Sequence, residues 1–122
     1  MTVLASVEEY LEGKDEGAVA LFRRFEQLVE RCGPSEIAPR QSIVYWKRER
    51  VWAGAYIERR RVELNIDLLR EAEHPCLLAA FNTTRRVITH RLRITSAEQL
   101  DDSIAALLQE AYEDVGPGTR GR

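Results

Sequence analysis

Residues 62–68 read Val-Glu-Leu-Asn-Ile-Asp-Leu, a run in which apolar and polar side chains alternate without a break. Successive side chains of a β-strand point to opposite faces of a sheet, so the run predicts a strand with one buried face and one polar face. Three arginines, residues 59–61, precede it and predict a hairpin turn. The run Val51–Glu58 before that turn is rich in residues that favour strands, which predicts an antiparallel partner.

Further strands are predicted on both sides of this hairpin. Residues 88–94, Ile-Thr-His-Arg-Leu-Arg-Ile, repeat the alternation and predict another half-buried strand. Residues 42–47 are also rich in strand formers. A short strand near Ile37 is compatible with the sequence, and residues 77–81 are ambiguous between element types.

Two helices are predicted before the strands. Ser6 with Glu9 three residues later has the form of a capping box and predicts a short helix, Val7–Glu12. Asp15 is suited to cap a second helix, in which apolar residues recur every three or four positions as far as Cys32. That apolar stripe predicts a helix that packs one face against the sheet.

A third helix is predicted after the last strand. Either Thr95 or Ser96 is suited to cap it, and a Gly-Pro-Gly sequence ends it. We expect residues 1–115 to form one domain and residues 116–122 to be a disordered C-terminal tail.

This order of elements predicts an α+β fold. Half-buried strands need cover on one face only, and the two long amphipathic helices, one N-terminal and one C-terminal, are sufficient to supply it. The predicted architecture is a single twisted antiparallel sheet with both long helices packed on one face. The other face is then open to solvent.

Several segments resemble the bacterial domain-of-unknown-function family 5655. The resemblance is carried by Val7–Gly13, by the strand Arg86–Ile94 with its Thr-His-Arg sequence, by Ile43–Tyr45 and by Ala111–Tyr112. It spans about Val7 to Tyr112 and implies a frataxin-like helix–sheet–helix organisation. It implies no activity, cofactor or catalytic residue, because none is defined for that family.

The net charge of −2 conceals a basic central third. Residues 1–39 carry four basic and eight acidic side chains, residues 40–93 carry twelve and six, and residues 94–122 carry two and six. The balances are therefore −4, +6 and −4. This distribution matters for binding if the central third forms one contiguous surface.

Composition and spacing indicate a cytoplasmic bacterial protein with no membrane segment. No apolar run approaches the roughly 20 residues that span a bilayer, and acidic residues near the N-terminus are incompatible with a signal peptide. Cys32 and Cys76 match no metal or redox spacing, so we expect two reduced thiols.

Motifs for catalysis and metal binding are absent from the sequence. It contains no nucleotide-binding loop and no nucleophile elbow, and His74 with Cys76 supplies too few ligands for zinc. We therefore predict no metal, no cofactor and no catalytic residue. His90 has two interpretations, a buried histidine hydrogen-bonded to backbone or to Tyr112, and a general base at the sheet edge.

The helix-free face is the predicted functional surface. Alternation assigns to it Trp52, Tyr56, Asn65, Arg91 and Arg93. Aromatic and guanidinium groups on one surface are typical of partner interfaces and of platforms for nucleic acid.

The strand of residues 42–47 adds to this face in one of two ways. It presents either Tyr45 with Lys47 or Trp46 with Arg48, and the sequence leaves the choice open. The leading hypothesis is a non-catalytic interaction module that uses the face for self-association or a protein partner. The alternatives are nucleic-acid or anionic-ligand binding and, last, an enzyme of unknown type.

Overall fold

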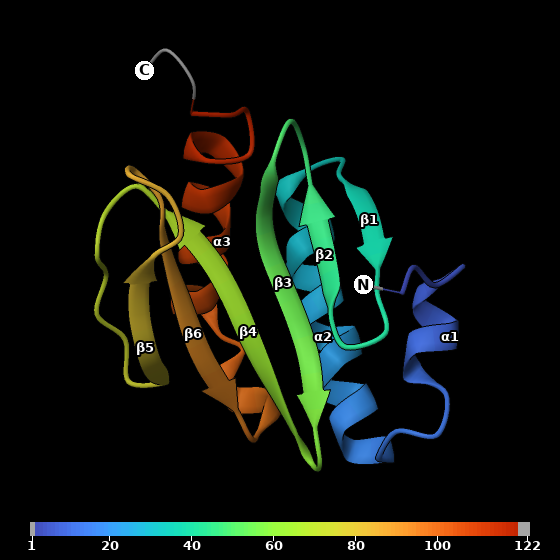
Figure 1. The fold of residues 1–122 in the computed structure, drawn as a ribbon. Helices are drawn as coiled ribbons and strands as arrows, with labels where there is room; N and C mark the ends of the chain where they lie inside the picture. Colours follow the sequence, from blue (N-terminus) through green and yellow to red (C-terminus); the bar gives the residue numbers. More distant parts are fainter. Residues whose placement is uncertain (1, 120–122) are drawn as a thin grey trace.

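A computed structural model describes residues 2–119 of the chain. Six strands form one sheet, and three α-helices and a short 3-10 helix accompany it (Figure 1). In chain order the elements are α1 (Val7–Leu11), α2 (Glu16–Cys32), β1 (Glu36–Pro39), β2 (Val44–Lys47), β3 (Val51–Glu58), β4 (Arg61–Leu68), β5 (Leu77–Asn82), β6 (Ile88–Ile94), η1 (Ala97–Gln99) and α3 (Asp102–Asp114).

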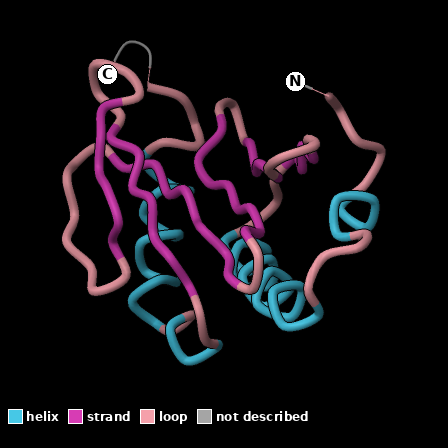
Figure 2. Tube along the Cα trace, turned by 60° about the horizontal axis from the view of Figure 1, so that its bottom comes forward, coloured by secondary structure: helices cyan, strands magenta, loops and turns pink. Residues whose placement is uncertain are grey.

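The sheet has the strand order β1-β2-β3-β4-β6-β5, and every neighbouring pair is antiparallel. The long helices α2 and α3 lie behind the sheet, and the face toward the viewer carries no helix (Figures 1 and 2). The predicted α+β class is thereby confirmed. The segment that was ambiguous in sequence is the edge strand β5.

The strand β4 lies at the centre of the sheet and supplies much of its apolar layer. Its side chains at Val62, Leu64, Ile66 and Leu68 are all 0% exposed. Leu64 lies opposite Ala55 of β3 on one side and opposite Leu92 of β6 on the other. The core therefore sits between this apolar face and the two long helices, as the alternation predicts.

The predicted caps of the first two helices are confirmed. The Ser6 hydroxyl accepts the N–H of Glu9 at 3.1 Å, and the Asp15 carboxylate accepts the N–H of Ala18 at 3.0 Å. Each bond satisfies a backbone donor that has no partner inside its own helix. The first helix ends at Leu11, one residue earlier than predicted.

The C-terminal helix begins later than the sequence pattern predicts. Ser96 does cap a helical turn, but that turn is the 3-10 helix η1, which ends at Gln99. Asp101 then caps α3, because its Oδ1 accepts the N–H groups of Ser103 at 3.0 Å and Ile104 at 3.3 Å. Two successive caps divide one predicted helix into a turn and a helix.

Residues 116–119, the first part of the predicted C-terminal tail, are hydrogen-bonded to the rest of the chain. The Gly116 carbonyl accepts the N–H groups of Glu49 and Arg50 at 2.8 and 3.1 Å, so it is bound to the β2–β3 turn. The Thr119 carbonyl accepts a hydrogen bond from Arg86. A turn at residues 115–117 follows α3, and residues 120–122 of the predicted disordered tail lie outside the described part of the chain.

Replacing Phe25 by Ala tests how α2 docks on the sheet. The Phe25 ring is fully buried and meets Trp46 edge-on with ring centroids 5.7 Å apart. We expect Phe25→Ala to lower the free energy of unfolding by about 3–5 kcal/mol, because it removes buried apolar area and leaves a cavity. Urea unfolding measures the loss. Gln27→Ala on the exposed side of α2 is the control, and a loss under about 1 kcal/mol for Phe25→Ala would contradict this packing.

Candidate functional site on the helix-free sheet face

Cross-strand pairing determines which side chains meet on the helix-free face. Asn65 of β4 lies between Gly54 of β3 and Arg91 of β6. Two positions away along β4, Glu63 lies opposite Arg93. Directly opposite residues of an antiparallel pair share a face, so these side chains form one polar row across the middle of the sheet.

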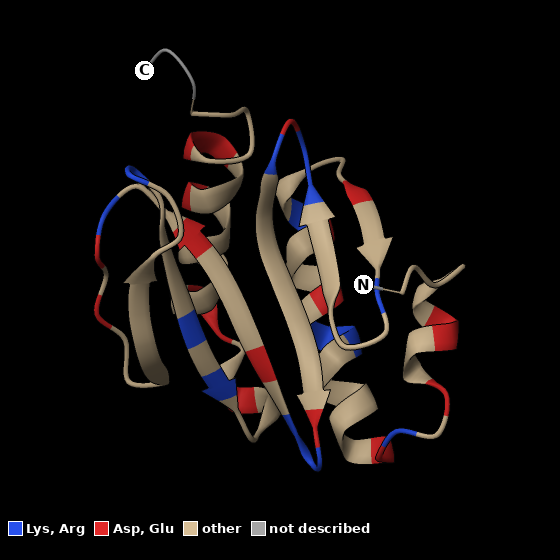
Figure 3. Cartoon of the chain, viewed as in Figure 1, with Lys and Arg blue, Asp and Glu red and all other residues tan. Residues whose placement is uncertain are grey.

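Basic residues gather on this side of the molecule. Figure 3 shows Lys and Arg along β6 and at the β2–β3 and β3–β4 turns, whereas α1 and α3 carry acidic residues. The sheet strands come from the basic central third of the sequence, residues 40–93, apart from β1 and the last residue of β6. The charge imbalance seen along the sequence is therefore also an imbalance between layers.

Trp52 is not part of this face, and the prediction that it points outward is wrong. Its side chain is 0% exposed. The ring meets Tyr112 of α3 edge-on with centroids 5.2 Å apart, and the indole N–H donates to the Ser35 hydroxyl at 3.0 Å. Trp52 therefore belongs to the core between the sheet and α3.

A β-bulge explains the orientation of Trp52. In the β2–β3 ladder Trp46 lies opposite Ala53, but Lys47 lies opposite Val51. Trp52 is the extra residue, and an extra residue shifts the alternation of a strand by one position. Side chains beyond the bulge keep the predicted facing, and the tryptophan itself turns to the helices.

At one end of the polar row, a buried carboxylate collects three donors. Glu63 accepts the Tyr56 hydroxyl at 2.6 Å, Arg93 Nη2 at 3.2 Å and Arg61 Nε at 3.3 Å. Burial raises the pKa of Glu63, but the three donors outweigh burial and hold that pKa below its ordinary value of 4.5. Burial and the Glu63 carboxylate together raise the pKa of Tyr56 to about 12.

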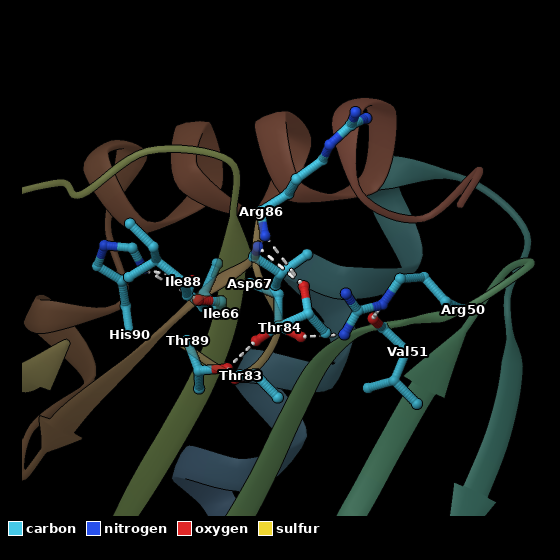
Figure 4. A network of polar contacts seen from close by, with 11 residues as sticks. Arg50, Val51, Ile66, Asp67, Thr83, Thr84, Arg86, Ile88, Thr89 and His90 are labelled. Atoms are coloured by element: carbon cyan, nitrogen blue, oxygen red, sulfur yellow. Dashed lines mark hydrogen bonds and ion pairs between the residues drawn. The ribbon is translucent and has the colours of Figure 1, made fainter. Parts of the chain in front are cut away.

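At the other end, Asp67 holds an arginine from the β2–β3 turn. Arg50 Nη2 donates to Asp67 at 3.0 Å, and the Thr89 hydroxyl donates to Asp67 at 2.7 Å (Figure 4). The Thr83 hydroxyl is hydrogen-bonded to that of Thr89. Burial raises the pKa of Asp67, and Thr89 and Arg50 oppose this effect only in part.

Arg91, between these two clusters, has no carboxylate partner among residues 2–119. Its guanidinium lies over the Phe81 ring, 5.5 Å from the centroid. The Arg91 Nε and the Asn65 Oδ1 are both buried and make no hydrogen bond within the described chain. The groups that remain available to a ligand are therefore the Arg91 terminal nitrogens and the Asn65 amide nitrogen.

Gly54 allows Tyr45 to pack closely over the row. A Cβ at Gly54 would lie 3.1 Å from the Tyr45 ring and 3.3 Å from the Ile43 side chain, tighter than ordinary contacts. The side of β2 that faces outward, left open by the sequence, is thus the side of Tyr45. The other aromatic residue of that strand, Trp46, is buried under α2.

A cleft of about 390 Å³ lies over the middle of the row. Its walls come from β2, the β2–β3 turn, β5 and β6. The lining residues are Tyr45, Arg50, Val51, Ala53, Asn65, Asp67, Phe81, Thr83, Thr89 and Arg91.

The cleft brings together two of the five residues predicted for the face, Asn65 and Arg91. Tyr56 and Arg93 lie beside it in the Glu63 cluster. Sequence reasoning missed Arg50, Phe81 and Thr83. Arg50 lies in a turn, and the other two lie in or after β5, where the sequence has no alternation to assign a facing.

His90 is buried on the helix side of β6, and its structural interpretation is confirmed. Its Nε2 accepts the N–H of Ala72 at 2.9 Å. Its Nδ1 lies 3.1 Å from the Ile88 carbonyl and 3.3 Å from the Ile66 carbonyl (Figure 4). An N–H can only donate, so Nε2 is unprotonated and Nδ1 carries the hydrogen. Both nitrogens are engaged by backbone, not by Tyr112.

The other histidine belongs to a chain of hydrogen bonds at the start of α3. His74 Nδ1 accepts the N–H of Cys76 at 3.0 Å, so Nε2 carries the hydrogen and donates to the Ser103 hydroxyl at 2.8 Å. Ser103 in turn donates to Asp101 at 2.5 Å. In a catalytic pair the histidine accepts the proton of the serine hydroxyl. Here His74 donates to Ser103 and has no free lone pair to accept the serine proton, so Ser103 is not activated.

Residues 2–119 show neither a cluster of metal ligands nor a helix suited to span a membrane. No group of three or more His, Cys, Asp or Glu side chains in that range is placed to hold a metal ion. Cys32 and Cys76 are free, and burial raises the pKa of both thiols. None of the helices in this range is long and apolar enough to cross a membrane.

The chain belongs to the family described as Domain of unknown function (DUF5655), whose family model matches residues 7–115. That range contains the whole sheet and both long helices. No curated protein matches the sequence, and no solved structure matches it. The bacterial origin and the frataxin-like organisation that the resemblance implies stay predictions.

Replacing Glu63 by Gln tests the buried carboxylate cluster. We expect Glu63→Gln to lower the free energy of unfolding by about 2 kcal/mol at pH 7, because charge-assisted bonds from two arginines are lost. The folded-state pKa of Glu63 is lowered, so its stabilisation is complete above the ordinary pKa of 4.5 and is lost as pH falls through the folded value.

Urea unfolding across a pH series measures this difference between wild type and variant. The difference should be full at neutral pH and shrink at acid pH. Glu58→Gln is the control, because the Glu58 side chain is 49% exposed and, within residues 2–119, forms its ion pair with Arg61 alone, at 3.4 Å. A difference that stays constant down to low pH would show that the charge of Glu63 does not stabilise the fold.

Proposed function

We propose that this member of the DUF5655 family is a non-catalytic binding module that holds an anionic ligand in the cleft of the helix-free face. The observation that carries the proposal is the contrast between Arg91 and its neighbours. Arg50 and Arg93 each donate to a buried carboxylate, whereas Arg91 has no such partner in the described chain. An unpaired guanidinium in a cleft favours a negative ligand.

The other polar groups of the cleft are mainly donors. Arg50 uses Nε and Nη2 for Val51 and Asp67, which leaves its Nη1 outside these bonds. The Asn65 amide nitrogen also lines the cleft, whereas the Thr83 hydroxyl already donates to Thr89, whose own hydrogen goes to Asp67. Asp67 supplies the one carboxylate of the lining, and its two oxygens already accept bonds from Arg50 and Thr89. Net donor capacity and net positive charge together suit an anion.

Size and shape favour a small ligand with a planar part. The volume of about 390 Å³ falls in the range of roughly 300–1,000 Å³ that is usual for small-molecule sites. Tyr45 and Phe81 supply aromatic surface from opposite sides of the face, β2 and β5. Phe81 is 42% exposed, so one part of its ring stays available for stacking beside Arg91.

Self-association or a protein partner, the leading hypothesis from sequence, receives less support. Its aromatic anchor was Trp52, which lies in the core. The large apolar side chains that are exposed are scattered over the described chain, and of these only Phe81 lines the cleft. Interfaces depend on clustered buried anchors, so a hollow lined by donors is better explained by a small anion.

Replacing Arg91 by Gln tests the cleft. We expect inorganic phosphate and benzoate, used as an anionic probe and a planar anionic probe, to shift the amide resonances of Asn65 and Arg91 in a saturable way. Arg91→Gln should weaken binding of both probes about tenfold, the equivalent of one lost charge-assisted hydrogen bond. Titration followed by NMR measures both.

Arg24→Gln is the matched control, because Arg24 is exposed on α2, on the other side of the sheet. It should leave the titrations unchanged. Equal affinity of wild type and Arg91→Gln for both probes, or shifts that map away from the cleft, would refute the proposal.

A further inference from the structure

We infer that the ligand of this face is single-stranded nucleic acid, with one base in the cleft and the phosphates along the arginines of β6. This inference rests on the proposed function and extends it from a small anion to a polymer. It depends on three observations: the position of the charges, the way the arginines are held, and the aromatic groups at the cleft.

Positive charge continues from the cleft along β6 to the β3–β4 turn (Figure 3). Arg91 and Arg93 are two residues apart on one face of a strand, which places their Cα atoms roughly 7 Å from each other. Beyond them, Arg59, Arg60 and Thr95 line a second open hollow next to the end of β6. A flexible polyanion that enters the cleft therefore meets further cations along one line.

Two carboxylates of the face, Glu63 and Asp67, lie beneath the arginines, and the exposed one at the end of β3, Glu58, is paired with Arg61. The side chains of Glu63 and Asp67 are 5% and 8% exposed, whereas the Arg93 side chain is 41% exposed. Arg93 uses Nη2 to bind Glu63 and its Nε is buried, so its Nη1 remains for an outer partner. A guanidinium held at one edge by a buried carboxylate is oriented in advance for a phosphate at its other edge.

Acidic residues are concentrated on the other layer of the molecule. The sequence outside residues 40–93 has a balance of −8, from the −4 of each flank, and it includes all three α-helices. The flanks repel a polyanion while the central third, at +6, attracts it. The field therefore orients a polyanion toward the helix-free face despite the net charge of −2.

The aromatic residues select a single strand over a duplex. The volume of the cleft is sufficient for one planar group. Phe81 supplies an aromatic ring at the cleft, and the Arg91 guanidinium lies over one side of that ring. Base stacking on an aromatic ring needs an unpaired base, and a stacking platform with cationic walls is typical of single-strand binding. The helix-free face presents no helix to a groove of duplex DNA, so a duplex can make fewer contacts with it.

Fluorescence anisotropy with oligothymidylate and oligouridylate of about ten nucleotides tests this inference on the full chain. Both should bind, with a salt slope of about 2–3 for three to four phosphate contacts. Thymidine monophosphate should bind at least about tenfold more weakly than the oligonucleotide, because it reaches the cleft alone.

Variants separate the contribution of the arginines at the β3–β4 turn from that of the cleft. The double variant Arg59→Gln with Arg60→Gln should lower the salt slope of oligonucleotide binding by about one and weaken that binding several-fold. The affinity for thymidine monophosphate should not change. Arg91→Gln should weaken the binding of both ligands. Phe81→Ala should weaken binding of the oligonucleotide about tenfold, and Arg24→Gln should leave the affinity for both ligands unchanged. Circular dichroism shows that each variant keeps the wild-type fold.

The outcomes are distinct. If thymidine monophosphate binds in the cleft as tightly as the oligonucleotide, the inference fails and the proposed function stands. If a duplex of the same length, or an acidic phosphopeptide of equal charge, binds as tightly as the single strand, charge alone governs binding and the inference is again overturned. If phosphate, benzoate and oligonucleotide all fail to bind at low salt, both proposals fail.

Discussion

The alternation of β4 is the constraint on which the rest of the molecule depends. Its apolar half is fully buried, which requires the helix layer on one side. Its polar half includes Glu63 and Asp67, whose side chains are only 5% and 8% exposed although no helix covers them. Buried carboxylates need partners, so the chain brings arginines from the β2–β3 turn, β4 and β6 to this face.

The periodicity of apolar residues predicted the elements that bury one face, because one-sided burial is what produces that periodicity. The strands β4 and β6 and the helix α2 were predicted nearly residue for residue. The two successive helix caps near the C-terminus were not predicted. Ser96 and Asp101 are both suitable N-cap residues, and spacing alone does not show that each one begins a helical segment. The edge strand β5 lacks alternation because it is partly exposed on both faces.

Trp52 shows where a pattern argument fails for a physical reason. Alternation gives the right face as long as the ladder has a regular register, and the β2–β3 ladder has an extra residue at this position. The hydrophobic gain from burying an indole against Tyr112 outweighs the irregularity of the ladder. An aromatic residue at the start of a strand, next to a charged turn, is therefore a poor marker of an open face.

The arrangement of charges on the face suits reversible binding. Arg50 and Arg93 lose side-chain freedom when the chain folds, because Asp67 and Glu63 hold them, so a ligand does not have to order them. Arg91 is held differently, by the Phe81 ring, and keeps its charge without a counter-ion in the described chain. The paired arginines thus give the face its shape, and the unpaired one gives a ligand the largest electrostatic gain. A site built in this way stays folded when it is empty and loses little entropy when it is filled.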